Sequence, residues 1–124
     1  MIHLDTGFLI RALVRGSPED SRLRTWLRDN ERLAMSTVAW AEFLCGPLGP
    51  KEIALALRIV PIREALSEAH AQLAAELFNG SGRRRGSLAD CLIAAAAIAA
   101  SAPLATTNPR DFERFTPHGL RLKP

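Results

Sequence analysis

The sequence predicts an α/β fold in which a central parallel sheet is covered by helices on both faces. Short apolar runs of strand length alternate with longer segments of helical periodicity along the 124 residues, and this alternation is typical of parallel sheets. Polar residues that suit helix N-caps follow several of the apolar runs, as expected at strand-to-helix junctions. We expect a single domain over residues 1–124, because this length suffices for one hydrophobic core.

The first strand and helix begin almost at the N-terminus. Residues 2–4 are apolar and predict a buried strand. The sequence Asp5-Thr6-Gly7 then turns the chain into a helix over residues 8–15, which has one apolar face. Ser17-Pro18-Glu19-Asp20 combines a cap, a proline and two acids, and therefore predicts the start of a second helix, over residues 18–29.

The middle of the chain continues the same alternation. In chain order, we expect a strand over residues 32–36, a helix over 38–45, a helix over 51–57, a strand over 58–62 and a helix over 64–78. Ser36-Thr37 suits the cap of the first of these helices, and Gly46-Pro47 ends it. Pro61 cannot donate a hydrogen bond to a neighbouring strand, so its strand is expected near the edge of the sheet.

An alanine-rich helix dominates the last third of the chain, and Ser87 is predicted to cap it. No residue from 91 to 100 is charged, so this helix is apolar all round and belongs in the core. Asp90 lies in its first turn, at the rim of that core. After it we expect a strand over residues 103–106, a short helix that ends near Phe112, and a last short strand over 120–122.

Arginine carries most of the positive charge. The net charge is +3, and Lys51 and Lys123 are the only lysines among 16 basic residues. Because guanidinium groups match phosphate geometry better than ammonium groups do, a nucleic acid is a plausible partner. An arginine-rich surface that merely reflects a GC-rich genome explains the same composition.

The cysteines and the N-terminus favour a cytoplasmic protein that does not enter a membrane. Cys45 and Cys91 lack metal-ligand spacing, and we expect both to be buried, reduced thiols. The first residues lack the pattern of a signal peptide. Residues 91–109 are uncharged, but Pro103 and the polar run from Thr106 to Asn108 argue against a transmembrane span.

Acidic residues recur where helices follow strands. They are, in order, Asp5, Glu42, Asp90 and the pair Asn108 and Asp111. In a parallel sheet such junctions lie at one edge, where several carboxylates repel one another unless a cation neutralises them. Oxygen ligands without His or Cys favour Mg²⁺, with Mn²⁺ as a plausible substitute. An acidic metal pocket on an arginine-rich protein indicates a phosphodiester hydrolase.

Each of these residues also has a simpler explanation. Asp5 and Asp90 can serve only as helix caps, and Glu42 can reach solvent on the outer face of its helix. Arg83, Arg84 and Arg85 lie in a glycine-flanked loop directly before the Asp90 helix. We expect this basic loop to contact phosphate, although a charge run is commonly just a solvated loop.

Taken as a set, the motifs resemble those of the PIN-domain ribonucleases, and most of all the VapC-type toxins of bacterial toxin–antitoxin pairs. The matching segments are Leu4-Asp5-Thr6, Thr37 with Glu42, Leu88-x-Asp90-x-x-Ile93-Ala94-Ala95, and Thr106-x-Asn108-x-x-Asp111-Phe112. The resemblance implies an α/β/α sandwich, Mg²⁺-dependent cleavage of RNA, a homodimer, and neutralisation by a small antitoxin. For that partner we expect an apolar face that includes Trp26, Trp40 and Phe43.

By position, Asp5, Glu42 and Asp90 match the family's three most regular acids, which hold the metal. The fourth acidic position falls on Asn108, which removes a charge, and Asp111 is placed to compensate. Thr6 is predicted to orient Asp5 or to contact the substrate. Two alternatives to a toxin are a PIN-type nuclease of RNA processing without an antitoxin and a non-catalytic scaffold that binds RNA or protein. The sequence does not reveal the RNA target.

Overall fold

Four parallel strands form the centre of the molecule. The computed structural model describes all 124 residues. The strands are β1 (Ile2–Leu4), β2 (Leu33–Ser36), β3 (Ile62–Glu64) and β4 (Leu104–Ala105), in the order β3-β2-β1-β4. All three pairings are parallel, and His3 of β1 aligns with Ala34 on one side and Leu104 on the other. The predicted parallel sheet is therefore confirmed.

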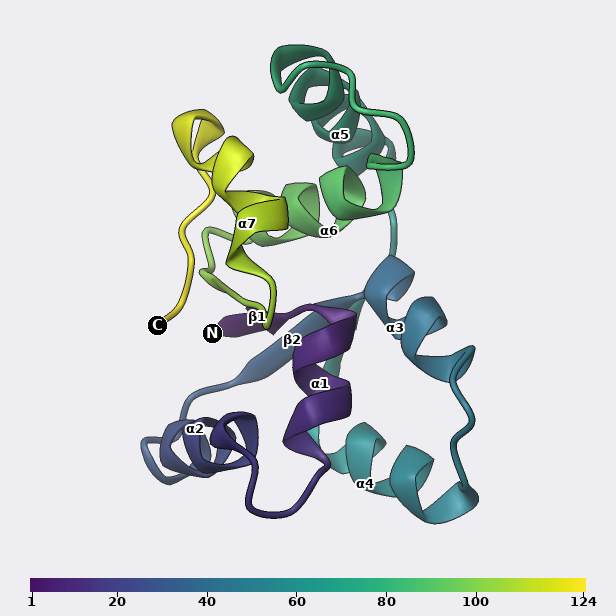
Figure 1. Ribbon diagram of the computed structural model, residues 1–124, viewed down its shortest axis with the longest axis vertical. Coiled ribbons are helices and arrows are strands. Elements are labelled where there is room, and N and C mark those ends of the chain that lie inside the picture. Colours follow the sequence, from purple (N-terminus) through teal and green to yellow (C-terminus); the bar gives the residue numbers. More distant parts are fainter.

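Helices cover both faces of this sheet. They are α1 (Thr6–Ala12), α2 (Pro18–Arg28), α3 (Thr37–Leu44), α4 (Pro50–Ile59), α5 (Glu68–Gly80), α6 (Leu88–Ala99), α7 (Pro109–Phe112) and the 3₁₀ helix η1 (Glu113–His118). Figure 1 shows α5, α6 and α7 above the strands and α1, α2 and α4 below them. This arrangement confirms the α/β/α sandwich. None of the helices combines the length and the apolar surface needed to cross a lipid bilayer.

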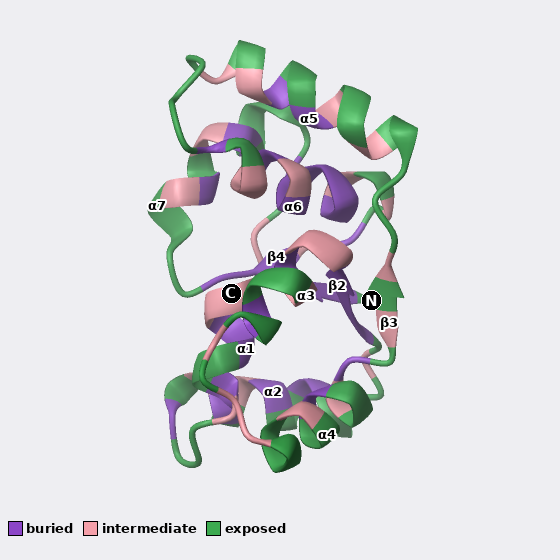
Figure 2. Ribbon diagram, turned by 90° about the vertical axis from the view of Figure 1, so that its right-hand side faces the viewer, coloured by how far each residue is buried: buried purple, intermediate pink, exposed green.

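The alanine-rich helix α6 is the most deeply buried helix of the upper layer (Figure 2). Four alanines in a row, from Ala94 to Ala97, are at most 1% exposed. Such small side chains let a helix approach the sheet and its neighbours closely. The burial confirms that α6 is a core helix, and it fixes the position of Asp90 in the first turn.

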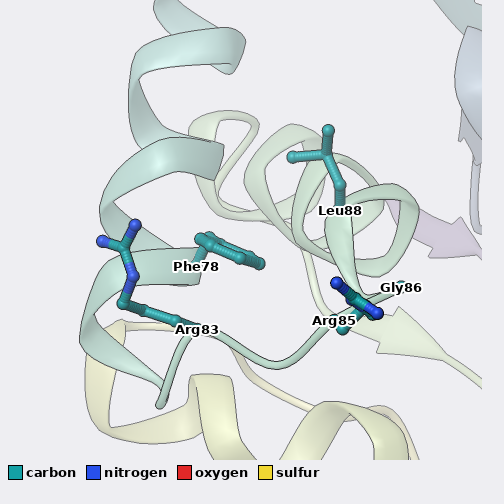
Figure 3. A pocket seen from close by; sticks show the side chains of 5 residues that line it. All are labelled: Phe78, Arg83, Arg85, Gly86 and Leu88. Atoms are coloured by element: carbon teal, nitrogen blue, oxygen red, sulfur yellow. The ribbon is translucent and has the colours of Figure 1, made fainter.

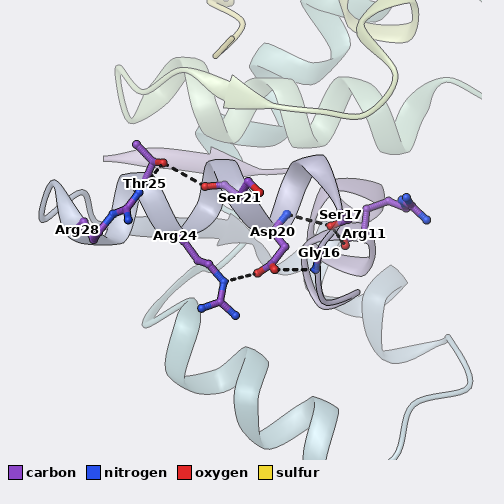
Figure 4. A network of polar contacts seen from close by, with 8 residues as sticks. All are labelled: Arg11, Gly16, Ser17, Asp20, Ser21, Arg24, Thr25 and Arg28. Atoms are coloured by element: carbon purple, nitrogen blue, oxygen red, sulfur yellow. Dashed lines mark hydrogen bonds and ion pairs between the residues drawn. The ribbon is translucent and has the colours of Figure 1, made fainter.

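The start of α2 follows the predicted capping pattern (Figure 4). Ser17 Oγ accepts the N–H of Asp20 at 3.0 Å and donates to the carbonyl of Arg11 at 2.7 Å. The Asp20 carboxylate accepts the N–H of Gly16 at 3.0 Å and Arg24 Nε at 2.9 Å. These bonds close the turn between α1 and α2. They also explain why α1 ends at Ala12 and not at residue 15.

The edge strand β3 is displaced from its predicted position. The sequence predicted a strand over residues 58–62, whereas α4 runs to Ile59 and β3 spans Ile62–Glu64. The N–H of Val60 still donates to a helical carbonyl at 2.9 Å, so the helix holds the first part of the expected strand. Pro61 cannot continue that helix, so the strand begins only after it.

Three further local predictions are wrong. The Ser87 hydroxyl donates to the carbonyl of Arg84 at 2.7 Å and does not cap α6. The C-terminal strand is reduced to an isolated bridge between Leu122 and Leu104. Cys45 is exposed: it lies just past α3, two positions beyond the buried Phe43, and two positions along a helix turn a side chain by about 200°.

The apolar face predicted for a partner is wrong for two of its three residues, whereas the third, Trp40, is half-buried. Trp26 is 6% exposed and Phe43 is fully buried, so neither can offer a face to a partner. Trp26 instead stacks on Phe8, with ring centroids 5.3 Å apart. Two exposed leucines, Leu27 of α2 and Leu55 of α4, line a groove between α1, α2 and α4. The groove has a volume of about 410 Å³.

Candidate active site

An open pocket of about 270 Å³ lies where α1, α3, α6 and α7 meet above the carboxyl ends of the central strands. Its lining consists of Asp5, Thr6, Gly7, Glu42, Asp90, Ile93, Thr107, Asn108, Asp111 and Phe112. The structure thus brings together all five residues predicted as catalytic, with Thr6 beside them. Segments more than 100 residues apart in sequence contribute to this one hollow.

Asp5 is held on both of its carboxylate oxygens. It follows β1 and is the N-cap of α1, because Oδ1 accepts the N–H of Phe8 at 2.7 Å. Oδ2 accepts a short hydrogen bond from the hydroxyl of Thr106, which follows β4. The side chain is only 7% exposed. Asp5 is therefore both a helix cap and a member of the pocket, so the two explanations of this residue are compatible.

Glu42 reaches the pocket from α3, which packs against α1 and α6. The Thr6 hydroxyl donates to Glu42 Oε1 at 2.8 Å. Thr6 therefore orients Glu42 and not Asp5. Gly7 next to it permits a close approach that no larger residue allows, since an added Cβ would lie only 2.9 Å from Thr107 Oγ1. This close approach joins α1 to the loop after β4.

The last two residues of the predicted catalytic set, Asn108 and Asp111, are hydrogen-bonded to each other. Asn108 Nδ2 donates to Asp111 Oδ2 at 2.6 Å, and the N–H of Asn108 donates to Thr106 Oγ1 at 3.0 Å. Thr106 therefore links Asn108 and Asp5 through one hydroxyl. Since the Asn108 amide nitrogen faces Asp111, its carbonyl oxygen remains available as a neutral ligand.

The carboxylates influence one another electrostatically. Burial raises the pKa of Asp5 against two opposing hydrogen bonds, and the charges of Glu42 and Asp111 raise this pKa further. Burial is also the main cause that raises the pKa of Asp90, and the charge of Asp111 raises it further. Ionised carboxylates held together in this way favour a bound cation.

The donor set fits a hard divalent cation. Carboxylate oxygens and one amide oxygen line the pocket, without His or Cys, as such ions prefer. No three of the acidic side chains converge closely enough to enclose an ion. The fit to a divalent cation therefore rests on the oxygen donors of the pocket and on the carboxylate charges that raise one another's pKa values.

The three loop arginines do not act as one group. Arg84 Nη1 lies 3.8 Å from Asp111 Oδ1 and so borders the acidic pocket. Arg83 and Arg85 instead line a separate hollow beside Phe78 (Figure 3). Of the three arginines predicted to contact phosphate, only Arg84 therefore lies beside the acidic pocket, and the phosphate contact itself stays a prediction.

The comparison with known families agrees with this geometry. The family model of the PIN domain matches residues 2–116. The chain belongs to the PIN domain family. PIN domains are nucleases that generally depend on a divalent metal ion, so this PIN domain is a hydrolase of the nuclease class. No relative is found among curated proteins.

Solved structures with the same fold come from bacterial toxin–antitoxin systems. VapBC2 from Rickettsia felis, bound to a promoter DNA fragment, aligns at 25% identity with a TM-score of 0.77, over 99% of this chain and 98% of that chain. VapBC-1 from nontypeable Haemophilus influenzae aligns at 24% identity with a TM-score of 0.73, over 99% and 97%. A toxin–antitoxin complex from Klebsiella pneumoniae aligns at 23% identity with a TM-score of 0.75, over 90% of each chain.

Sequence reasoning missed Arg114 of this PIN domain. Its Nη2 lies 3.8 Å from Asp90 Oδ2, and its guanidinium lies 4.7 Å from the centroid of the Phe115 ring. Its side chain is only 17% exposed, and its Nε and Nη2 are buried without hydrogen bonds. The charge of Arg114 lowers the pKa of Asp90 and so opposes the effect of burial. No motif distinguishes this residue from the other arginines.

The raised carboxyl pKa values predict how stability depends on pH. A raised pKa means that the folded state binds the proton more tightly than the unfolded chain does. The ionised Asp90 carboxylate therefore lowers the free energy of unfolding. This loss is fully present above the raised pKa of Asp90, becomes smaller as the pH drops through that pKa, and vanishes below the ordinary value of 3.8. The metal-free protein should therefore gain stability relative to Asp90→Asn between pH 7 and pH 4. Urea unfolding across this range measures the difference, and a relative loss would contradict the assigned direction.

Proposed function

We propose that the protein is an endoribonuclease that hydrolyses RNA phosphodiester bonds with Mg²⁺, or with Mn²⁺ in its place, as one domain over residues 1–124. The observation that carries the proposal is that Asp5, Glu42, Asp90 and Asp111 all line one pocket. Asp5, Glu42 and Asp90 would hold the metal, and Asn108 and Asp111 would complete the rim. Arg84, beside Asp111, is placed to contact a phosphate.

The side chains divide the catalytic work. A bound divalent ion lowers the pKa of a water molecule and polarises the phosphodiester. Thr106 and the N–H of Phe8 fix the two oxygens of Asp5, and Thr6 fixes Glu42. Such bonds to the ligands orient them before the substrate arrives. Asn108 holds Asp111 in the same way.

Removal of the metal is the direct test of this function. With labelled single-stranded RNA, we expect cleavage in Mg²⁺ or Mn²⁺ and its loss in excess EDTA, with recovery when the metal is added back. The ion supplies several kcal/mol of charge stabilisation, so the rate should fall by about a thousandfold or more. DNA of the same sequence serves as the control substrate. Cleavage that persists unchanged in EDTA would refute the proposal.

We further propose that the protein is the toxin of a type II toxin–antitoxin pair, acting in the cytoplasm as a homodimer. The solved structures of the same fold are toxin–antitoxin complexes. The groove between α1, α2 and α4 offers exposed apolar side chains, including Leu27 and Leu55. Apolar grooves of this kind bind amphipathic helices of a partner. Co-expression with the neighbouring short reading frame should yield a stable complex. Light scattering of this protein alone should give twice the mass of one chain.

A further inference from the structure

A second hollow, larger than the acidic pocket, lies between the end of α5 and the first turn of α6. Its volume is about 490 Å³, within the range of small-molecule sites. Phe78, Arg83, Arg85, Gly86 and Leu88 line it. In Figure 3 the Phe78 ring lies between Arg83 on one side and Leu88 with Arg85 on the other.

The hollow combines apolar surface with positive charge. Leu88 is 56% exposed, and Phe78 is half-buried against the core. The Arg83 guanidinium lies 5.7 Å from the centroid of the Phe78 ring and donates to Asn79 Oδ1 at 2.5 Å. An aromatic ring flanked by cations is the surface on which unpaired bases stack while their phosphates are neutralised.

The loop before α6 is shaped so that its arginines point to two sites. Gly82, Arg83 and Gly86 adopt positive φ angles of 97°, 54° and 80°, a region that non-glycine residues rarely enter. The N–H of Arg83 donates to the Phe78 carbonyl at 2.9 Å, which ties the loop to α5. Arg84 consequently reaches Asp111, while its two neighbours line the Phe78 hollow.

We propose that this hollow is a nucleotide subsite, which holds one unpaired nucleotide of the RNA beside the scissile phosphate. The base would pack on Phe78 and Leu88, and Arg85 would contact the phosphate. Arg85 lines the hollow, and its neighbour Arg84 lies 3.8 Å from Asp111 of the acidic pocket, so the two sites adjoin along this loop and one strand can extend from one to the other. The subsite rests on the proposed ribonuclease function and extends it to a preference for single-stranded RNA.

The experiment compares an RNA strand with a sugar–phosphate strand of the same length that carries no bases. Binding of a uridine pentamer and of the matching sugar–phosphate strand is measured by fluorescence anisotropy in the inactive Asp90→Asn background. Because stacking on an aromatic ring is the contact removed, Phe78→Leu should weaken pentamer binding about tenfold and leave the base-free strand unaffected. Phe78→Tyr keeps the ring and should restore binding. Thermal unfolding verifies that each variant is folded.

Two arginine variants separate charge from stacking. Arg85→Ala should weaken both strands and reduce the salt dependence by about one counterion. Arg58→Ala removes an equal charge from the exposed face of α4 and should change neither. If Phe78→Leu weakens both strands equally, or neither, the subsite assignment is overturned. If it weakens only the complex with a co-expressed antitoxin, the hollow is a protein contact and the assignment is likewise overturned.

The subsite and the enzymatic function can fail separately. If metal-dependent cleavage is present but Phe78→Leu has no base-dependent effect, the ribonuclease proposal stands and the subsite falls. If the protein neither binds nor cleaves RNA, both fall. A base-dependent loss restored by Phe78→Tyr supports the subsite alone, whatever metal the enzyme uses.

Discussion

The Asp90→Asn variant is expected to lose RNA cleavage by about a thousandfold or more while it keeps its fold. Several kcal/mol of the charge stabilisation come from the metal, and each 1.36 kcal/mol corresponds to tenfold in rate. Asparagine retains the size of the side chain but contributes no negative charge to the ion. A gel-based cleavage assay at saturating Mg²⁺ measures the loss, and Asp29→Asn, an exposed position at the end of α2, is the matched control.

The same variant should be at least as stable as the wild type without metal. Burial and the charge of Asp111 raise the pKa of Asp90, which means that its ionised form is disfavoured in the folded state. Removal of the charge relieves this cost, although it also removes the partner of Arg114. Urea unfolding in EDTA at pH 7 measures the outcome. Near-normal cleavage by a folded Asp90→Asn protein would remove Asp90 from the proposed site.

The sheet and its edge were predictable because few physical rules decide them. Alternating apolar runs and helices require a parallel sheet, and the ends of its strands must meet at one edge. Asp5 and Asn108 therefore lie together although 102 residues separate them in the numbering. The uncharged run of residues 91–100, which forms most of α6, likewise requires burial. Topology alone thus brings these residues to one pocket.

The local details were less predictable because tertiary contacts decide them. A serine before a helix usually caps it, yet the Ser87 hydroxyl bonds to the Arg84 carbonyl within the folded loop. The positive φ angle of Arg83 determines which arginine reaches Asp111, and no pattern encodes that angle. Arg114 approaches Asp90 only because η1 continues from α7, which packs on α6, so no spacing in the sequence indicates the pair.

Two substitutions of Asp5 separate its role as a cap from its role in the pocket. Asparagine caps helices as well as aspartate does, whereas alanine costs about 1 kcal/mol. Asp5→Asn should therefore keep the bond to the Phe8 N–H, which measures 2.7 Å in the wild type, and Asp5→Ala should lose it. Relative to Asp5→Asn, Asp5→Ala should be less stable by about 1 kcal/mol. Urea unfolding in EDTA measures this difference.

Cleavage should respond differently from stability. If Asp5 holds the metal, both variants lose the negative charge, and both should lose RNA cleavage by about a thousandfold. If Asp5 only caps α1, Asp5→Asn should cleave like the wild type, and Asp5→Ala should lose activity only in proportion to its unfolded fraction. The Asp5→Asn variant is therefore decisive, because it alters the charge at the pocket while it preserves the start of the helix. An active, stable Asp5→Asn protein would show that the Thr106 and Phe8 contacts hold Asp5 for structure alone.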